Sequence, residues 1–532
     1  MSQAMSISNQ SYIVDQLDAS FWSQQPEAIR SRVALVDGIL HISEEIRGDL
    51  DMLALVATLR RKGVLHYKFH SPMEFAENYT KFIVRCITNK NEIERLLIDI
   101  IGRAYKDKAS DIHLTDNGEY TRIQFRILGM LCEDTALDIE TGRQLIRATY
   151  EHVSTSTDNQ QFSINARCDG RITDRVYLPE NVHSIRVHCE PIDCPQAEGG
   201  YGTFMTLRLL YDSTEAQGTL AERMELLGFV ESQIEDMEFL MQRTGMIMIS
   251  GATGHGKTTL LKHIIEAMTV AMPYKAYHTV EDPPEFPLKN VHQIRVSTNV
   301  QDKLVAYLDA MAGALRSDPD VLMFGEIRYK EAAEVAIQAA MSGHPVFTTI
   351  HSSNAFGIVT RLVRMLSSVS AMITLDSLCD SNVLAGLEYQ RLIPKLCPHC
   401  KRLFGDLDKA EKQIAIPKRI MAALERVMDF EEINKIYVRS TGNDNCEYCN
   451  KRGFKGQTVA AEVVALDQDM LSAMRVGKTF EAYNIWRSKG KISFLDHAIA
   501  LVKQGVVDPV FATVRLAVPL DFNKFFETSG GK

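Results

Sequence analysis

The spacing of apolar and polar residues predicts an amphipathic helix at residues 91–106. Its apolar positions recur every three or four residues and therefore lie on one face. These positions are Ile93, Leu96, Leu97, Ile100 and Ile101. Before this helix the chain shows only short amphipathic stretches, such as 46–60, between polar breaks. No chemistry can be named from residues 1 to about 90, which favour a small adaptor domain or a loosely attached arm.

Short runs of strand-forming residues follow the helix. Two of them, ASDIHL at 109–114 and RIQFRILGML at 122–131, are separated by the turn-prone segment 115–118. Further strand candidates are Arg171–Tyr177, Ser184–His188 and Thr203–Leu210. Because one helix is mixed with several strands, this region predicts an α+β domain.

The polar segment LYDSTEAQGTL, at 210–220, marks a domain boundary. After it, the apolar run MIMIS at 246–250 predicts a buried strand, which leads into a glycine-rich loop and a helix at 258–268. Strands and helices then alternate to about residue 390. This alternation is typical of a doubly wound α/β sheet.

The composition fits a folded protein of several domains. The chain has 532 residues, of which 45% are apolar and 24% charged, so two to four domains are expected. Its net charge of −9 argues against non-specific binding to nucleic acid or anionic lipid, although it allows a local basic patch. No apolar run is long enough to span a membrane, and the N-terminus lacks a signal-peptide pattern. We therefore expect a cytoplasmic protein or one that docks peripherally on a membrane.

The loop at 251–258, GATGHGKT, matches G-x-x-x-x-G-K-[ST] in full. In such a loop, glycines let backbone N–H groups surround phosphate oxygens, and the helix that follows adds a favourable dipole. Lys257 is expected to reach the β- and γ-phosphates, and the hydroxyl of Thr258 to ligate Mg²⁺. The predicted nucleotide-binding residues are Gly251, Ala252, Thr253, Gly254, His255, Gly256, Lys257, Thr258 and Thr259.

Acidic residues follow two of the later predicted strands. The run VLMFGE ends in Glu326, with Gly325 at the position where a magnesium-binding Asp is usual. The other acids lie in Glu281–Glu285, after the run 276–280. Acids at the carboxyl ends of strands point to the ligand crevice of a doubly wound sheet. Glu326 and Glu285 are therefore rival candidates for orienting the attacking water, while a solvated acidic loop is the alternative for 281–285.

His351 ends the predicted strand 345–350. A single histidine is usually structural or on the surface. Its place at a strand end of the same sheet makes it a candidate sensor of the γ-phosphate.

The paired cysteines, out of ten in the chain, predict a metal site. The pairs Cys397/Cys400 and Cys446/Cys449 each form C-x-x-C, and four thiolates close a tetrahedral zinc site with no open position. We therefore expect zinc to be structural. Redox-active pairs are the alternative, because one C-x-x-C alone can exchange disulfides. His399 lies inside the first pair and is expected to be a spectator.

These motifs, in this order, resemble the secretion ATPase superfamily, and most closely the assembly ATPases of type II secretion and type IV pili. The resemblance covers about 91 to about 465. The segments that carry it are ASDIHL, FRILG, SIRVHCEP, LRLL, GMIMISGATGHGKTT, TVEDPPE, LRSDPDVLMFGEIR, SGHPVFTTIHSSNA, RLIPKLCPHC and CEYCNKRGFKGQ. The family has an atypical Walker B segment, which accounts for Gly325.

The resemblance implies an α/β fold with a RecA-like P-loop NTPase core, a PAS-like α+β N-terminal domain and a tetracysteine zinc module. It implies a homohexamer in which Arg186 and Arg208 complete the nucleotide site; ordinary surface arginines are the alternative. It also implies docking on a platform protein at the cytoplasmic face of the bacterial inner membrane. The zinc module favours assembly over retraction ATPases.

Three positions depart from the family pattern: Leu128, where Asp is frequent, Tyr329, where Asp is frequent, and His255, where Ser is frequent. None removes a phosphate contact, and together they suggest a divergent branch such as the type IVb or bundle-forming pilus group.

The expected division of the chain is a partner-binding region at 1–90, the PAS-like domain at 91–210, a linker at 211–222 and the ATPase domain at 223–532, which includes the zinc module at 391–462 and C-terminal helices. A cytoplasmic recruiting protein is a further candidate partner of residues 1–90.

We expect hydrolysis of Mg-ATP that powers extrusion of a pilus or pseudopilus, without a nucleic-acid partner. Two other function classes stay open. One is a nucleic-acid translocase, and ATP hydrolysis stimulated by single-stranded DNA would support it. The other is a scaffold that binds ATP without turnover.

Overall fold

The computed structural model describes residues 29, 32–36, 39–61, 66–78, 90–153, 155–156, 166–197, 199–211, 218–296, 302–366, 374–440 and 446–523. The chain divides into two compact units. The first comprises the described residues of 1–127, 131–180 and 184–209, and the second comprises the rest.

The first described elements form a small α/β layer. Its sheet has the order β1-β2-β3, with β1 antiparallel and β3 parallel to β2. The elements are β1 (Val33–Val36), β2 (Ile39–Ser43), β3 (His66–His70), α4 (Leu50–Arg61) and α5 (Pro72–Asn78). Alternate apolar residues of β2 and the apolar face of α4 share a core, which includes Leu40, Ile42, Met52, Leu55 and Leu59.

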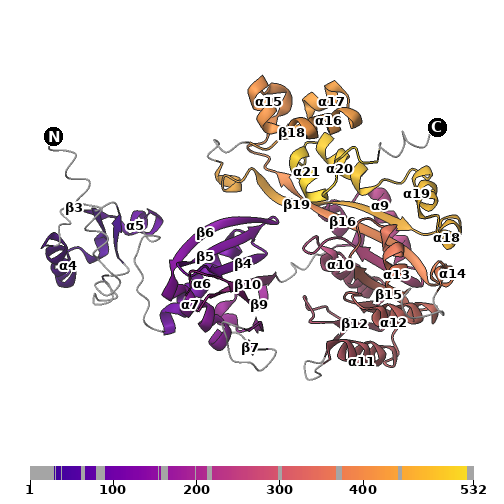
Figure 1. Ribbon diagram of the computed structural model, residues 1–532, viewed down its shortest axis with the longest axis horizontal. Coiled ribbons are helices and arrows are strands. Elements are labelled where there is room, and N and C mark those ends of the chain that lie inside the picture. The colour runs from indigo at the N-terminus through magenta and orange to yellow at the C-terminus, as the bar shows by residue number, and fades with distance from the viewer. Residues whose placement is uncertain are drawn as a thin grey trace. The chain divides into compact units, whose positions relative to one another are not determined.

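A seven-stranded sheet follows, in the order β6-β5-β4-β10-β9-β8-β7. Its strands are β4 (Asp111–Asp116), β5 (Tyr120–Ile127), β6 (Met130–Asp138), β7 (Thr155–Ser156), β8 (Cys168–Ile172), β9 (Val182–Asp193) and β10 (Tyr201–Tyr211). The helices α6 (Lys90–Lys106) and α7 (Ile139–Ala148) pack against β4 and β5 (Figure 1). The amphipathic helix expected at 91–106 is thus confirmed.

Two of the predicted strands in this region were wrong in part. The run at 122–131 is split into β5 and β6 by a two-residue turn, in which Leu128 and Gly129 have φ of 51° and 79°. Positive φ at both central residues suits the twist of a tight hairpin. The strand proposed at Arg171–Tyr177 ends at Ile172. A 3₁₀ turn follows, because the side chain of Asp174 accepts the backbone N–H of Val176 at 3.0 Å.

The second unit contains a mixed seven-stranded sheet in the order β13-β12-β14-β15-β11-β16-β19. Figure 1 labels β12, β15, β16 and β19 of this sheet. The first six strands are parallel, and β19 runs antiparallel to β16. The strands are β11 (Gly245–Ser250), β12 (Tyr277–Glu281), β13 (His292–Arg295), β14 (Val321–Phe324), β15 (Pro345–Ile350), β16 (Leu384–Leu396) and β19 (Phe454–Ala465).

Helices cover both faces of this sheet. Alternate residues of β11 belong to the two buried clusters, one on each face. Ile247 and Ile249 pack in one buried cluster with the helices α8 (Leu220–Leu227), α9 (Glu231–Leu240) and α10 (Lys257–Ala271). Met246 and Met248 pack in the other cluster. Its helices include α11 (Lys303–Leu315), α12 (Lys330–Met341), α13 (Gly357–Leu366), α18 (Gln468–Arg475), α19 (Thr479–Ser488), α20 (Phe494–Lys503) and α21 (Pro509–Leu516). The core strands are buried on both sides and therefore read as continuous apolar runs.

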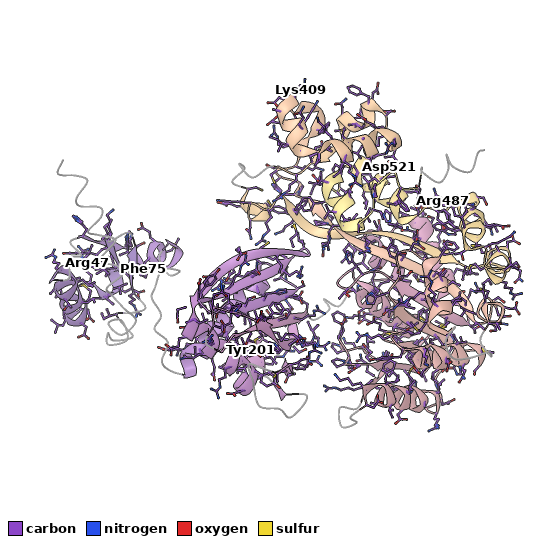
Figure 2. All side chains as sticks on the ribbon, in the orientation of Figure 1. Arg47, Phe75, Tyr201, Lys409, Arg487 and Asp521 are labelled. Atoms are coloured by element: carbon purple, nitrogen blue, oxygen red, sulfur yellow. The ribbon has the colours of Figure 1, made fainter. Side chains whose placement is uncertain are left out.

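A small layer of short elements is inserted between β16 and β19. It contains β17 (Arg402–Leu403), β18 (Tyr437–Val438), α15 (Lys409–Ala415), α16 (Lys418–Val427) and α17 (Phe430–Lys435). Figure 2 labels Lys409, the first residue of α15. Among the described residues, no helix combines the length and the apolar character needed to cross a membrane.

Candidate functional site

The glycine-rich loop joins the end of β11 to the start of α10, as the sequence predicts. Gly254 and Gly256 have φ of 75° and 81°, a conformation that costs side-chain-bearing residues free energy. A Cβ on Gly251 would lie 2.5 Å from the carbonyl oxygen of Gln390. The loop therefore needs glycine for its backbone path and for close contact with β16.

Lys257 is the first residue of α10, and its side chain is buried. Its ammonium donates hydrogen bonds to two loop carbonyl oxygens, at 3.0 Å to Gly251 and 3.3 Å to Ala252. Burial lowers the pKa of Lys257, while the nearby carboxylates of Glu326, Glu388 and Glu285 oppose that shift. Thr258 and Thr259 are half-buried in the first turn of the helix.

Glu326 follows β14 and is held by two basic side chains. Its Oε1 lies 2.9 Å from Nε2 of His351, and its Oε2 accepts bonds from Arg328 at 2.7 and 2.9 Å. The preceding residue, Gly325, is fixed from both sides. Its N–H donates to the carbonyl of Val280 on β12, and its own carbonyl accepts the hydroxyl of Thr349 on β15. Glu326 is therefore anchored by three neighbouring strands.

His351 follows β15 and bridges Glu326 to the phosphate-binding loop. Its Nδ1 lies 3.0 Å from the carbonyl oxygen of Gly251, and its Nε2 faces Glu326. A carbonyl and a carboxylate are both acceptors, so both bonds together require a proton on each ring nitrogen. The sequence-predicted Lys257, Glu326 and His351 thus lie at one edge of the sheet and are linked through the carbonyl of Gly251.

The acidic residues of 281–285 differ in exposure: Glu281 is buried, Asp282 exposed and Glu285 half-buried. Glu281 is the last residue of β12 and is buried, and its Oε1 accepts bonds from Thr279 at 2.8 Å and Gln293 at 3.1 Å. Burial raises the pKa of Glu281, and these two hydrogen bonds act against the rise. Glu285 is half-buried, and its charge acts on that of Lys257.

Strand β16 forms hydrogen bonds with the phosphate-binding loop. The sequence did not predict this contact. The amide of Gln390 donates to the carbonyl of His255 at 2.6 Å, and the backbone N–H of Leu392 donates to Nδ1 of His255 at 2.8 Å. Burial, followed by the charges of Arg515, Arg391 and Lys257, lowers the pKa of His255 to about 3. The ring is therefore neutral and acts as an acceptor.

Glu388, on the same strand, was also not predicted as a site residue from the sequence. It has no exposed surface, and neither of its carboxyl oxygens has a hydrogen-bond partner among the described residues. An acid inside the otherwise apolar run LAGLEY was the available signal.

The arginines expected to reach nucleotide belong to the first unit. Arg186 is exposed on β9, and Arg208 lies on β10. Nε of Arg208 donates to Asp111 at 2.8 Å, while Arg208 remains 44% exposed.

The four paired cysteines come together. Their sulfur atoms all lie within 4.8 Å of one another, with 3.8 Å between Cys397 and Cys446 and 3.7 Å between Cys400 and Cys449. A tetrahedral zinc site with Zn–S bonds of about 2.3 Å separates its sulfurs by about 3.8 Å. The cluster therefore has the size of a four-thiolate metal site.

Comparison with known proteins places the chain in a family. The family model described as "Type II/IV secretion system protein" matches residues 87–516. A putative type II secretion system protein E of Escherichia coli K12 is 30% identical over 382 residues, which are 71% of this chain and 68% of that protein. The type II secretion system ATPase E of Vibrio cholerae is 28% identical over 417 residues, 78% of this chain and 73% of that protein. The type IV pilus assembly ATPase TfpB of Acinetobacter baylyi is 28% identical, over 72% of this chain and 58% of that protein.

Solved structures share the fold. The ATPase DotB of Legionella pneumophila aligns with a TM-score of 0.55 at 19% identity, covering 80% of this chain and 96% of that one. DotB of Yersinia pseudotuberculosis aligns with a TM-score of 0.51 at 19% identity, covering 81% and 94%. The chain therefore belongs to the type II/IV secretion system protein family and is an ATPase of the group that serves type II secretion and type IV pilus assembly.

Proposed function

We propose that the chain works as a cytoplasmic homohexamer that hydrolyses Mg-ATP to drive assembly of a type IV pilus or a type II secretion pseudopilus. One observation carries this proposal: Lys257, His351 and Glu326 are linked through the carbonyl of Gly251, next to a helix N-terminus. Relatives named as a type II secretion ATPase and a type IV pilus assembly ATPase support the same work.

In this proposal the buried ammonium of Lys257 exchanges its two loop carbonyls for the β- and γ-phosphate oxygens of ATP. The backbone of Gly251–Thr259 surrounds the phosphates. The hydroxyl of Thr258, in the first turn of α10, fits the role of a magnesium ligand, and the acids nearby fit ligands that act through water. Bound Mg²⁺ would neutralise charge on the β- and γ-phosphates.

Glu326 is the first candidate for orienting the attacking water, because His351 and Arg328 fix its carboxylate at a strand end. Glu285 is the rival, since it is half-buried and its charge reaches Lys257. His351 would sense the γ-phosphate, because its Nδ1 bonds the loop that holds the phosphates and its Nε2 bonds Glu326. Movement of the loop would then be transmitted to the acid.

Arg186 and Arg208 would neutralise transition-state charge when the ring closes. Their exposure supports this role, because neither is buried in its own sheet. We propose that the sheet carrying them is the PAS-like domain, within the division 1–90, 91–210, 211–222 and 223–532. Docking on an inner-membrane platform protein, and recruitment through residues 1–90, belong to the same proposal.

Zinc is proposed for the cysteine cluster, because the sulfur separations fit four-thiolate coordination. Cys397, Cys400, Cys446 and Cys449 would hold it. A closed four-thiolate site stabilises the fold and offers no position for substrate. The backbone N–H of Gly453 already donates to Sγ of Cys449 at 3.2 Å, a contact that stabilises a thiolate.

The test is specific ATPase activity measured against protein concentration, with Mg²⁺ present and particle mass recorded. A steep rise together with six-subunit particles is expected, because subunits would complete one another's sites. Lys257→Ala is expected to abolish turnover, whereas the exposed Lys478→Ala serves as a matched control. Activity that a monomer sustains alone would overturn the hexamer, and a fully active Lys257→Ala variant would overturn the site.

A further inference from the structure

A buried carboxyl group lies beneath the phosphate-binding loop. Glu388 is on β16, where it pairs in parallel register with Ile249 of β11, two residues before Gly251. Ile249 packs in the cluster that α10 covers, together with Leu260 and Leu261. Neighbouring residues of paired strands share a face. Glu388 therefore faces α10, whose first residue is Lys257.

Gln390 supports this placement. It is two residues further along β16 and so lies on the same face. Its amide nitrogen donates to the carbonyl of His255 at 2.6 Å, inside the loop. The face of β16 that carries Glu388 is thus the one that contacts the loop.

The carboxyl group of Glu388 makes no hydrogen bond of ordinary geometry with the described residues, although the backbone N–H of Ser250 lies near enough to act on its charge. It is fully buried, and neither oxygen has a hydrogen-bond partner there. Burial raises the pKa of Glu388 well above its ordinary value, and the charge of Glu462 on β19 adds to the rise; Lys257 and the backbone of Ser250 oppose it. A buried polar group without a partner costs about 1–3 kcal/mol, so its presence calls for a reason.

Lys257 is the cationic group that fits Glu388. Its ammonium has three N–H groups, and the described residues give it two acceptors, the carbonyls of Gly251 and Ala252. Glu388 is among the carboxylates whose charge stabilises that ammonium. One donor and one unsatisfied acceptor therefore lie within electrostatic reach of each other.

We infer that Glu388 is a positioning residue for nucleotide binding: its ionised carboxylate attracts the ammonium of Lys257 and opposes phosphate there, and its protonation lets the ammonium turn to phosphate. This inference rests on the proposed nucleotide site. While the phosphate site is empty, the ammonium of Lys257 bonds the carbonyls of Gly251 and Ala252, and its charge favours the ionised form of Glu388. In the bound state the ammonium, with its three protons, turns to the phosphates, and Glu388 takes one proton from solvent. The exchange leaves no unpaired charge in the core.

The exchange makes nucleotide affinity depend on pH in one direction. When pH rises through the pKa of Glu388, the ionised form accumulates and competes with phosphate for Lys257. Affinity should therefore fall as pH rises, by up to about tenfold per pH unit for one linked proton. Glu462 also titrates nearby, because burial, which its hydrogen bonds from Ala355 and Phe494 oppose, raises its pKa to about 7.

The experiment measures ADP and ATP dissociation constants of the full chain by calorimetry between about pH 6 and about pH 9, in buffers of different ionisation enthalpy. Wild type should bind more weakly at alkaline pH and take up protons on binding. Glu388→Gln should bind nucleotide with a flat pH profile and without proton uptake. Glu388→Leu, in which apolar packing replaces the acid, should do the same if Gln alters folding. Glu462→Gln, at another buried acid, should keep a pH-dependent affinity, but over a lower pH range, because the charge of Glu462 raises the pKa of Glu388.

Equal slopes in wild type and folded Glu388→Gln would overturn the inference and leave the nucleotide site intact. Failure of wild type to bind nucleotide at any pH would instead overturn the proposed function.

Discussion

Lys257 and His351 share one acceptor, the carbonyl oxygen of Gly251, at 3.0 Å from each donor atom. One residue begins the helix after β11, and the other follows β15. These strands are parallel neighbours, paired from Gly245 with Pro345 to Ser250 with Ile350. A phosphate that draws Lys257 away leaves His351 as the remaining donor to this carbonyl. In the proposed site, nucleotide binding would thereby be coupled to the His351–Glu326 pair.

Glu326→Gln should lower kcat by about 10²–10⁴-fold while ATP affinity stays within about threefold of wild type, because the amide still accepts a bond from His351 but cannot take a proton. Steady-state hydrolysis and equilibrium nucleotide binding check this. Glu331→Gln, in the first turn of α12, is the control and should leave both unchanged. Full turnover by Glu326→Gln together with loss in Glu285→Gln would give the role to Glu285.

His255→Ala should destabilise the second unit by about 1–3 kcal/mol, because it removes the acceptor of the Leu392 N–H. It should also raise the KM for ATP, since β16 keeps only the bond from Gln390 to the backbone carbonyl of residue 255 and holds the loop less firmly. His255→Asn can supply an acceptor and should recover most of both losses. Thermal unfolding and ATPase kinetics measure them. Because the pKa of His255 is lowered to about 3, the wild-type ring stays neutral and should add no pH dependence to kcat near neutrality.

Arg208→Gln should reduce ATPase activity of the assembled ring by at least about tenfold without weakening nucleotide binding by the chain, if Arg208 acts on transition-state charge. Arg122→Gln is the matched control, because Arg122 lies on the same sheet, in an ion pair with Glu133, and should stay active. The assay compares turnover at equal ring occupancy, measured by particle mass. Equal activity of the two variants would mean that Arg208 has only a structural role, through its ion pair with Asp111.

Metal analysis of reduced, unstripped protein should find about one zinc per chain, because the four sulfurs have the separations of one closed site. Cys400→Ser should lose the metal and unfold at lower temperature. Cys132→Ser, at a half-exposed cysteine outside the cluster, should keep it. Clearly less than one zinc per chain in wild type would contradict the site, and disulfide formation within each pair would favour the redox alternative.

Sequence reasoning reached the parts of the molecule whose chemistry is local. The phosphate-binding loop could be predicted because its three glycines, Lys257 and Thr258 fall within eight consecutive positions, directly after an apolar run and at the start of a helix. The metal site of the cysteine pairs could be predicted because two ligands at C-x-x-C spacing are already close in the chain. Local patterns also misled the prediction of two strands. Leu128 and Gly129 form a turn inside the strand predicted at 122–131, and the side chain of Asp174 stabilises the turn that follows the shortened strand predicted at 171–177.

By itself, the sequence determined which residues are candidates for the chemistry: a lysine on a glycine-rich loop, acids at strand ends, a histidine and four cysteines. Only the tertiary structure decided how they combine. The pairing of parallel strands from distant segments brings His351 next to Gly251 and Glu326. It also places β16 against His255, and it buries Glu388 on the sheet face that α10 covers. The physical reason is that hydrogen-bonded register between strands depends on the packing of both sheet faces, which no local pattern encodes.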